Sequence, residues 1–383
     1  MLTEKEELSL QTRLLHHKYK SDSQTGAVSV PIQHASTFHQ ETLDSFGKYD
    51  YARSGNPTRE ALEEIIAGLE NGTKGFAFAS GMAAISTTFM LLSAGDHLVI
   101  TEDVYGGSYR MTTEVLTRMG IEHTFVDMTN VESVERAIRP NTRMIYMETP
   151  SNPTMKITPV KEITGLARKN DCISVVDNTF LTPVLQRPLD LGADIVVHSA
   201  TKFIGGHSDV VAGLAVVKGP VIAEKIGFLQ NSFGAILGPQ DAWLIMRGIK
   251  TMHTRMEASE KSALKIARRL SEHPAVNRVY YPGLETHSGY DQNKLQSEGS
   301  GAVLSFELRD RSHVKKVVES VQLPVFAVSL GAVESILSYP AQMSHAAMPQ
   351  AEREKRGITD GLLRLSVGLE KAEDIITDLE RAL

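Results

Sequence analysis

Lys202 is the residue whose type and position in the sequence most directly suggest chemistry. It closes the stretch Ser199-Ala200-Thr201-Lys202, which follows an apolar, β-branched run at residues 194–197 and precedes Gly205-Gly206. The run predicts a short buried strand, and the two glycines allow a sharp turn after it. Because ligands of open α/β sheets bind at the carboxyl ends of strands, a lysine there can lose part of its hydration and become a nucleophilic amine. An isolated lysine after a strand is more often a plain surface residue, so this interpretation depends on the rest of the sequence.

Three further positions could contribute to a site, and each also has a purely structural explanation. Ser80-Gly81-Met82 separates a predicted strand from a predicted helix, where free backbone N–H groups could hold a phosphate or form an ordinary tight turn. Asp177 ends the run at 173–177 and could be a metal ligand, a base, a partner for a protonated ring nitrogen, or a helix cap. Tyr105, just before Gly106-Gly107, could stack on a flat cofactor ring or lie in a loop with its edge in water.

Arg364 is a cation within an otherwise apolar predicted strand at residues 362–367. A buried guanidinium needs a partner, and a substrate carboxylate held by two parallel hydrogen bonds would provide one. The alternative is an alternating strand with Arg364 on its hydrated face. Lys202, Asp177 and Arg364 taken together favour an enzyme.

Sequence motifs of several other enzyme classes are absent. The sequence has no Gly-x-x-x-x-Gly-Lys-[Ser/Thr] phosphate loop, no Gly-x-Gly-x-x-Gly dinucleotide turn, no His-Glu-x-x-His and no Gly-x-Ser-x-Gly elbow. His207-Ser208-Asp209 and His16-His17 lack further ligands at a suitable spacing. We therefore expect no metal site.

Composition limits the expected environment and partners of the protein. The chain of 383 residues is 42% hydrophobic, has a formal net charge of −6 and contains a single cysteine, Cys172. It has no basic tract, so we expect neither nucleic acid nor an anionic membrane as a partner. The first residues are acidic and lack a signal core, and the longest apolar stretch, at 82–92, is well short of the ~20 residues of a membrane span. With no intramolecular disulfide possible, these features predict a cytoplasmic protein.

Strands and helices alternate from residue 75 to residue 217, a pattern typical of a mostly parallel sheet with helices on both faces. After residue 218 the pattern changes to long helical segments followed by more strands, which predicts a second, smaller α/β domain. These later strands are expected at 276–281, 302–308, 325–328 and 363–367. Residues 21–57 show no sustained periodicity and predict an extended arm that could pack on a partner subunit. The expected organisation is an amino-terminal arm at 1–57, a large domain at 58–250 and a small domain at 251–383.

Several of these segments together resemble the Cys/Met-metabolism family of pyridoxal-phosphate (PLP) enzymes, which are proteins of fold type I. The resemblance covers the chain from about residue 25 to the carboxyl end. In chain order, it rests on Tyr51-Ala-Arg53-Ser-Gly-Asn-Pro-Thr58, Ser80-Gly81-Met82, Glu148-Thr-Pro-Ser-Asn152-Pro153, Asp177-Asn178-Thr179-Phe180 and Asp194-Ile-Val-Val-His-Ser-Ala-Thr-Lys202 with Gly205-Gly206-His207. It implies a PLP-dependent transferase-like α/β fold, in which helices sandwich a mostly parallel sheet and a smaller C-terminal α/β domain follows.

The resemblance also implies a role for each site residue. Lys202 would carry PLP as an internal Schiff base and later act as acid and base, and Asp177 would pair with the pyridine nitrogen. Tyr105 would stack on the ring and could handle a proton near the leaving sulfur. The phosphate would be held by Gly81, Met82, Ser199 and Thr201 of one subunit and by Tyr51 and Arg53 of its neighbour. The substrate carboxylate would be held by Arg364, with Asn152 and Ser329. An active unit of at least two subunits follows, and the family usually forms homotetramers, as dimers of dimers.

Residues expected at the rim of the pocket help to distinguish β-elimination from γ-elimination. Val328-Ser329-Leu330-Gly331 has valine where γ-lyases and γ-synthases of the family commonly have glutamate, and residues 328–345 look most like the cystathionine β-lyases of Gram-positive bacteria. The resemblance therefore implies carbon–sulfur bond cleavage by β-elimination of cystathionine, giving homocysteine, pyruvate and ammonia, a transsulfuration step of methionine biosynthesis. The alternatives are γ-elimination to cysteine, 2-oxobutyrate and ammonia, γ-replacement by a synthase, and a PLP-binding protein without turnover.

Overall fold

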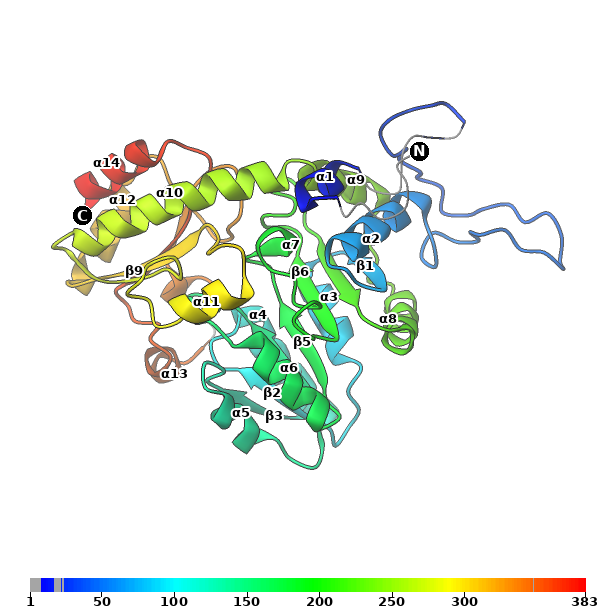
Figure 1. Cartoon of the computed structure of the whole chain (residues 1–383), viewed down its shortest axis with the longest axis horizontal. Helices are drawn as coiled ribbons and strands as arrows, with labels where there is room; N and C mark the ends of the chain where they lie inside the picture. Colours follow the sequence, from blue (N-terminus) through cyan, green and yellow to red (C-terminus); the bar gives the residue numbers. More distant parts are fainter. Residues whose placement is uncertain (1–7, 17–21, 23, 347) are drawn as a thin grey trace.

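The computed structural model describes residues 8–16, 22, 24–346 and 348–383 and contains two β-sheets (Figure 1). The larger sheet consists of β1 (Lys74–Phe78), β2 (His97–Thr101), β3 (Glu122–Val126), β4 (Thr142–Glu148), β5 (Ile173–Asp177), β6 (Ile195–Ser199) and β7 (Gly213–Val217). Its strand order is β1-β7-β6-β5-β4-β2-β3. The five strands from β6 to β3 run parallel, and β7 runs antiparallel to both of its neighbours. The expected mostly parallel sheet is confirmed.

Helices cover both faces of this sheet. One face carries α2 (Pro57–Leu69), α5 (Val131–Ala137), α6 (Val160–Lys169) and α9 (Pro239–Ile249), whose apolar side chains join one core. The other face carries α3 (Gly81–Phe89) and α8 (Pro220–Phe233), which contribute to a second core. Strands β5, β6 and β7 are buried along almost their whole length, and this burial on both faces explains why their sequences are continuous apolar runs.

The smaller sheet belongs to the carboxyl-terminal part of the chain. It consists of β8 (Val276–Tyr280), β9 (Val303–Leu308), β10 (Val325–Phe326), β11 (Ile336–Ser338) and β12 (Leu362–Ser366), in the order β10-β11-β12-β9-β8. Its neighbours are antiparallel except for β10 and β11. Helices α12 (Val314–Ser320) and α14 (Ala372–Ala382) pack against it around a third core. Strand β11 was not predicted, because three residues are too short to show a period.

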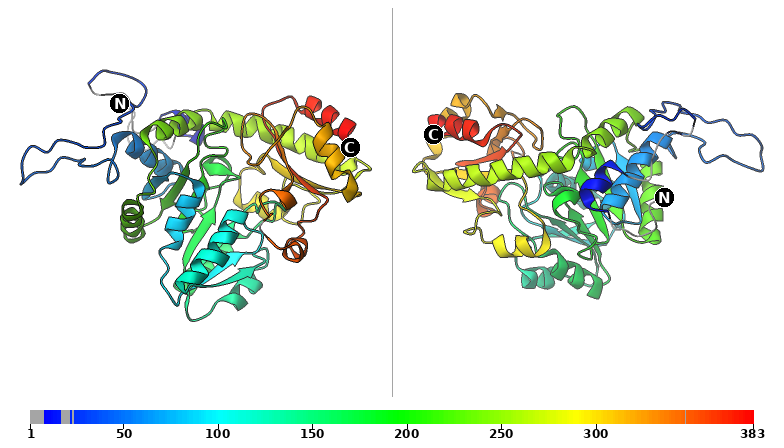
Figure 2. Two further views of the ribbon diagram at one scale, coloured as in Figure 1. Left: turned by 180° about the vertical axis from the view of Figure 1, so that it is seen from behind. Right: turned by 45° about the horizontal axis from the view of Figure 1, so that its top comes forward.

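One long helix connects the two sheets. Helix α10 (Met252–Glu272) runs along the top of the molecule in Figure 1 and lengthwise in the right view of Figure 2. Its first turns, with Met252 and Met256, belong to the core of the larger sheet, whereas Ile266 and Leu270 belong to the core of the smaller one. Among the described residues, no helix is both long enough and apolar enough to cross a membrane.

Residues 24–56 extend away from the body of the molecule (Figures 1 and 2). Leu43, within this segment, is 92% exposed. The segment ends where α2 begins, and the Asn56 side chain caps this helix by accepting hydrogen bonds from the backbone N–H groups of Thr58 and Arg59. Of the expected arm, residues 1–7, 17–21 and 23 lie outside the described residues, and α1 (Leu10–Leu15) packs near α2.

Candidate active site

A cavity of about 430 Å³ lies at the carboxyl ends of the parallel strands, between the two sheets. Its wall contains every predicted site residue except Tyr51 and Arg53. From the larger sheet and its loops come Gly81, Met82, Tyr105, Asn152, Asp177, Ser199, Thr201 and Lys202, and from the carboxyl-terminal part come Ser329 and Arg364. Residues as far apart in the sequence as Gly81 and Arg364 therefore meet in one place.

Lys202 lies in the tight turn that follows β6. Its backbone N–H donates to Ser199 O (3.1 Å), and its side-chain Nζ donates to Ser329 Oγ (2.6 Å). Burial and, to a smaller extent, the nearby charge of Arg364 together lower the pKa of Lys202 to about 8. A substantial fraction of this amine is therefore neutral near physiological pH, which a nucleophile or base requires.

Arg255, on α10, donates hydrogen bonds to the turn that carries Lys202. The sequence analysis did not identify Arg255 as a site residue. Its Nη1 donates to Phe203 O (2.7 Å), and its Nη2 donates to Gly248 O (2.8 Å) at the end of α9. The space is so tight that a Cβ on Gly206, whose φ is +76°, would lie 2.1 Å from Arg255 Nη1. The turn that presents Lys202 is thus held by a buried guanidinium, whose pKa burial lowers to about 10.

Asp177 occupies the carboxyl end of β5 with its side chain buried. Its Oδ1 accepts hydrogen bonds from Thr179 N (3.0 Å) and Thr179 Oγ1 (2.6 Å), and its Oδ2 accepts one from Tyr146 OH (3.2 Å). Burial raises the pKa of this carboxyl above its usual value. A cation placed against it from the cavity would favour the ionised form, which suits a protonated ring nitrogen. Among the described residues, no set of three His, Cys, Asp or Glu side chains is arranged to hold a metal ion.

The start of α3 offers hydrogen-bond donors to an anion. Ser80 caps the helix, with its Oγ accepting from Ala83 N (3.0 Å), and the first intrahelical bond runs from Ala84 N to Ser80 O. The N–H groups of Gly81 and Met82 therefore have no acceptor within the helix. A Cβ on Gly81 would lie 2.8 Å from Ser199 Cβ, so glycine allows the helix start to approach β6 closely. This cradle fits a phosphate.

Arg364 is 3% exposed within β12, whose residues are all buried. The interpretation that places it on a hydrated strand face is therefore wrong. Its Nη1 donates to Asn152 Oδ1 (2.8 Å) and its Nη2 donates to Ser329 O (2.7 Å), while its Nε has no partner among the described residues. Burial lowers its pKa to about 10. A buried guanidinium with neutral partners and a free N–H is suited to bind a carboxylate.

Tyr105 lies at the mouth of the cavity, as the N-cap residue of α4 (Gly106–Arg110). Its backbone N–H donates to Glu148 Oε2 (3.0 Å), at the end of β4. Arg110 and Val328 also line the cavity. Neither Glu148 nor Arg110 was predicted as a site residue, although Glu148 begins the motif at 148–153.

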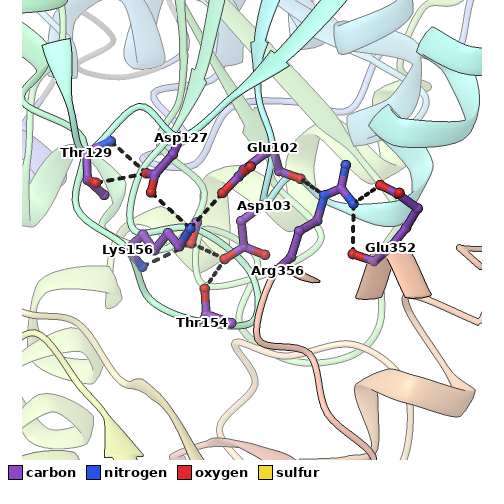
Figure 3. A network of polar contacts seen from close by, with 9 residues as sticks. Glu102, Asp103, Asp127, Thr129, Thr154, Lys156, Glu352 and Arg356 are labelled. Atoms are coloured by element: carbon purple, nitrogen blue, oxygen red, sulfur yellow. Dashed lines mark hydrogen bonds and ion pairs between the residues drawn. The ribbon is translucent and has the colours of Figure 1, made fainter. Parts of the chain in front are cut away.

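A polar network supports the loop that carries Asn152 (Figure 3). Ser151 Oγ donates to Asp103 Oδ2 (2.5 Å), and Thr154 donates to the same carboxylate. Lys156 pairs with Glu102 (2.9 Å), whose backbone carbonyl accepts from Arg356 Nε (2.9 Å) next to α13 (Gln350–Lys355). The network joins the end of β2, this loop and the carboxyl-terminal part of the chain.

Tyr51 and Arg53 lie outside the cavity of their own chain. Arg53 Nη1 donates to Asn231 O (2.8 Å), and its guanidinium lies over the Tyr51 ring, 5.5 Å from the ring centroid. Tyr51 is 47% exposed. The expectation that both residues reach the phosphate of a neighbouring subunit is consistent with this position.

Fold and site define a fold-type-I pyridoxal-phosphate enzyme with an amino-acid substrate. The family model described as "Cys/Met metabolism PLP-dependent enzyme" matches residues 11–383, and the chain belongs to this family. It is 65% identical over 375 residues to cystathionine beta-lyase MetC of Bacillus subtilis (strain 168), covering 98% of this chain and 96% of that one. It is 52% identical over 372 residues to cystathionine gamma-lyase of the same organism, covering 97% and 98%.

The fold also agrees with solved structures. The chain superposes with a TM-score of 0.95 and 48% identity on a cystathionine gamma-lyase from Lactobacillus plantarum complexed with L-serine, covering 98% of each chain. The family implied by the sequence motifs, its fold and its cofactor are thereby confirmed. The residues of the cavity also fit PLP by their chemistry: a desolvated amine, a buried carboxyl group and an anion cradle lie in its wall.

Proposed function

We propose that the protein cleaves the Cβ–S bond of L-cystathionine, giving homocysteine, pyruvate and ammonia. The observation that carries an elimination at an amino acid is the joint placement of a half-buried amine, Lys202, and a buried guanidinium, Arg364. Both donate hydrogen bonds to Ser329. The relatives named cystathionine beta-lyase, at 65% identity in Bacillus subtilis and 52% in Lactococcus lactis, support the choice of substrate and bond.

The proposed roles follow from the contacts of each residue. Arg364, oriented by Asn152, binds the substrate α-carboxylate, and Lys202 in its neutral form removes the proton from Cα. Bound PLP supplies an electron sink for the electron pair left at Cα. Asp177 stabilises positive charge at the inner end of the cavity, while Gly81, Met82, Ser199 and Thr201 hold the phosphate. As the C–S bond breaks, sulfur leaves as the thiol of homocysteine, and one water converts the remaining enamine to pyruvate and ammonia.

The mouth of the cavity favours a leaving group with a carboxylate at its far end. Arg110 brings a positive charge there, and Tyr105 can protonate the departing sulfur. Val328 is 65% exposed and adds no negative charge at the position where γ-enzymes commonly carry glutamate. The positive Arg110 and the uncharged Val328 support cystathionine as the substrate. The distal half of cystathionine carries both an ammonium and a carboxylate group, and we propose that the carboxylate is directed to Arg110.

The keto acid released from L-cystathionine by the PLP-loaded protein tests this proposal. We expect pyruvate and homocysteine in equal amounts, and K202A should reduce their formation by several orders of magnitude because proton transfer at Cα is lost. Release of 2-oxobutyrate with cysteine would instead establish γ-elimination. Turnover by K202A near the wild-type rate would contradict the role of Lys202.

γ-Elimination is the second candidate. It is favoured by the relative named cystathionine gamma-lyase in Bacillus subtilis, at 52% identity, and by the Lactobacillus plantarum structure. The same Lys202, Asp177 and Arg364 would serve it, with Lys202 also moving a proton at Cβ.

We further propose a cytoplasmic homo-oligomer, at least a dimer and as a tetramer a dimer of dimers. Its arm, with Tyr51 and Arg53, would complete the phosphate site of the neighbouring subunit. The exposure of Leu43 and Phe46 in the arm, and the absence of Tyr51 and Arg53 from the wall of their own cavity, support this arrangement. The proposed division remains an arm at 1–57, a large domain at 58–250 and a small domain at 251–383, with the last boundary in the turn before α10.

A further inference from the structure

Glu148 joins two separate loops of the cavity wall. It ends β4, is 6% exposed and lines the cavity. Its carboxyl group accepts the backbone N–H of Tyr105, with an Oε2–N distance of 3.0 Å. The backbone of Asn152 is close enough to act on the same carboxyl group and to lower its pKa. Tyr105 belongs to the loop after β2, whereas Asn152 belongs to the loop after β4. One side chain therefore lies between the two loops.

Both loops carry groups on which the site depends. Tyr105 provides the aromatic ring at the cavity mouth, and Asn152 Oδ1 accepts from Arg364 Nη1 (2.8 Å). Arg364 Nη2 in turn donates to Ser329 O, and Ser329 Oγ accepts from Lys202 Nζ. A shift of the Asn152 backbone would therefore change the orientation of Arg364. Through Ser329 it would also change the position of Lys202 Nζ.

Glu148 also lies beside Asp177. The two residues are register partners on parallel strands, so their side chains point to the same face of the sheet. Burial raises the pKa of Glu148 well above its usual range, and the charges of Asp177 and Asp103 act in the same direction. A carboxyl group that keeps its proton has the same shape and a similar hydrogen-bonding capacity as an amide.

We propose that Glu148 is a positioning residue of the cofactor cavity, whose carboxyl group fixes Tyr105 against the PLP ring and Asn152 against the carboxylate-binding Arg364. This role concerns the geometry of the cavity and is independent of whether the bond at Cβ or at Cγ is broken. It rests on acceptance of the Tyr105 backbone N–H, which the side-chain oxygen of glutamine can provide and alanine cannot.

Glu260 offers a matched control within the same chain. It lies on α10 and likewise accepts the backbone N–H of a loop residue, Ser300, away from the cavity. Its removal should therefore cost stability in the same way while leaving the cofactor site intact.

The experiment compares E148A, E148Q, E260A and E260Q as apoproteins. PLP dissociation constants are obtained by titration, following the absorbance of the bound cofactor, and melting temperatures are measured without PLP. We expect E148A to weaken PLP binding about tenfold or more and E148Q to stay within about threefold of the wild type, because only the former loses the acceptor. We expect E260A to lower the melting temperature and to keep PLP affinity within about twofold.

Turnover of L-cystathionine gives a second readout. E148A should raise KM more than it lowers kcat, because the misplaced Asn152 acts on the carboxylate clamp. The proposal is overturned if E148A binds PLP as tightly as the wild type, if E260A weakens binding equally, or if E148Q is as impaired as E148A. The PLP titration contains no substrate, so it decides the role of Glu148 even if the protein does not cleave cystathionine.

Discussion

The reactivity of Lys202 depends on its surroundings more than on its residue type. Burial and the charge of Arg364 both disfavour the ammonium form, and Ser329 Oγ fixes the position of Nζ. Because the hydrogen-bonding partners of Arg364 are an amide and a carbonyl, its charge is not neutralised through them. The site therefore holds two cations that gain stability when an anionic substrate or cofactor binds.

The pH dependence of cofactor uptake follows from this pKa. Only the neutral amine attacks the aldehyde of PLP, so the rate of reconstitution of the apoprotein should rise as the pH increases through about 8. R364M removes a nearby positive charge, which should raise the pKa of Lys202 and move the midpoint to higher pH, whereas R364K should keep it near 8.

Initial rates measured by absorbance between about pH 6.5 and 10 test this, with K202A as the blank for other lysines. A wild-type midpoint near 10.5, the usual lysine value, would contradict the proposed desolvation.

Sequence reasoning found the site residues that interrupt or end an apolar run. Lys202, Asp177 and Arg364 have this signature because a polar group at the end of a buried strand, or within one, is unusual. Glu148 also ends an apolar run, at 144–147, but its contact with Tyr105, 43 positions away, is visible only in the folded chain. Arg255 lies within a helical segment and has no such signature, and its partner Phe203 is 52 positions away.

At the scale of elements, the turn between β6 and the following loop is the most constrained part of the site. It is held from one side by Arg255 and from the other by Gly331, where a Cβ would lie 2.6 Å from Phe203 N. The two glycines after Lys202 predicted a sharp turn, and Gly206 does adopt a positive φ. The elements that confine this turn come from a helix and a loop that sequence periodicity does not connect to it.

Substitution of Gly206 measures how much this confinement matters. G206A adds a Cβ at a φ of +76° and at 2.1 Å from Arg255 Nη1, so it should lower stability by about 2–4 kcal/mol through backbone strain and displacement of the guanidinium. G95A is the control, because Gly95 has a φ of +90° and nothing within 4 Å of its Cβ position. It should cost only about 1 kcal/mol. If G206A and G95A lose the same free energy of unfolding in urea, the Arg255 side chain can move aside without destabilising the protein.

At the scale of the whole molecule, the cavity is a product of both sheets and, as proposed, of two subunits. The alternating strands and helices predicted the larger sheet, because buried parallel strands have a strong sequence signature. The placement of the smaller sheet over the cavity depends on α10 and on long-range contacts such as Arg356 with Glu102 (Figure 3). Local sequence patterns contain no information on these contacts.

Mixed oligomers test the proposed contribution of the arm. K202A and R53A should each be impaired, but joint refolding should restore about a quarter of the wild-type activity, because half of the hybrid sites contain neither change. K202A mixed with D177N is the control, since both residues belong to one chain's cavity and every hybrid site keeps one lesion. Recovery in neither mixture, or a monomer in solution, would contradict the shared site.

The order of the cavity residues along the chain has a consequence for synthesis. A nascent chain that has reached residue 250 already contains Lys202 and Asp177 but lacks Ser329, in the loop after β10, and Arg364, in β12. The amine is therefore exposed to water, and keeps its ordinary charge, until the last part of the chain has folded over it. We therefore expect Lys202 to reach its lowered pKa, and with it rapid capture of the cofactor, only after Arg364 has folded into place.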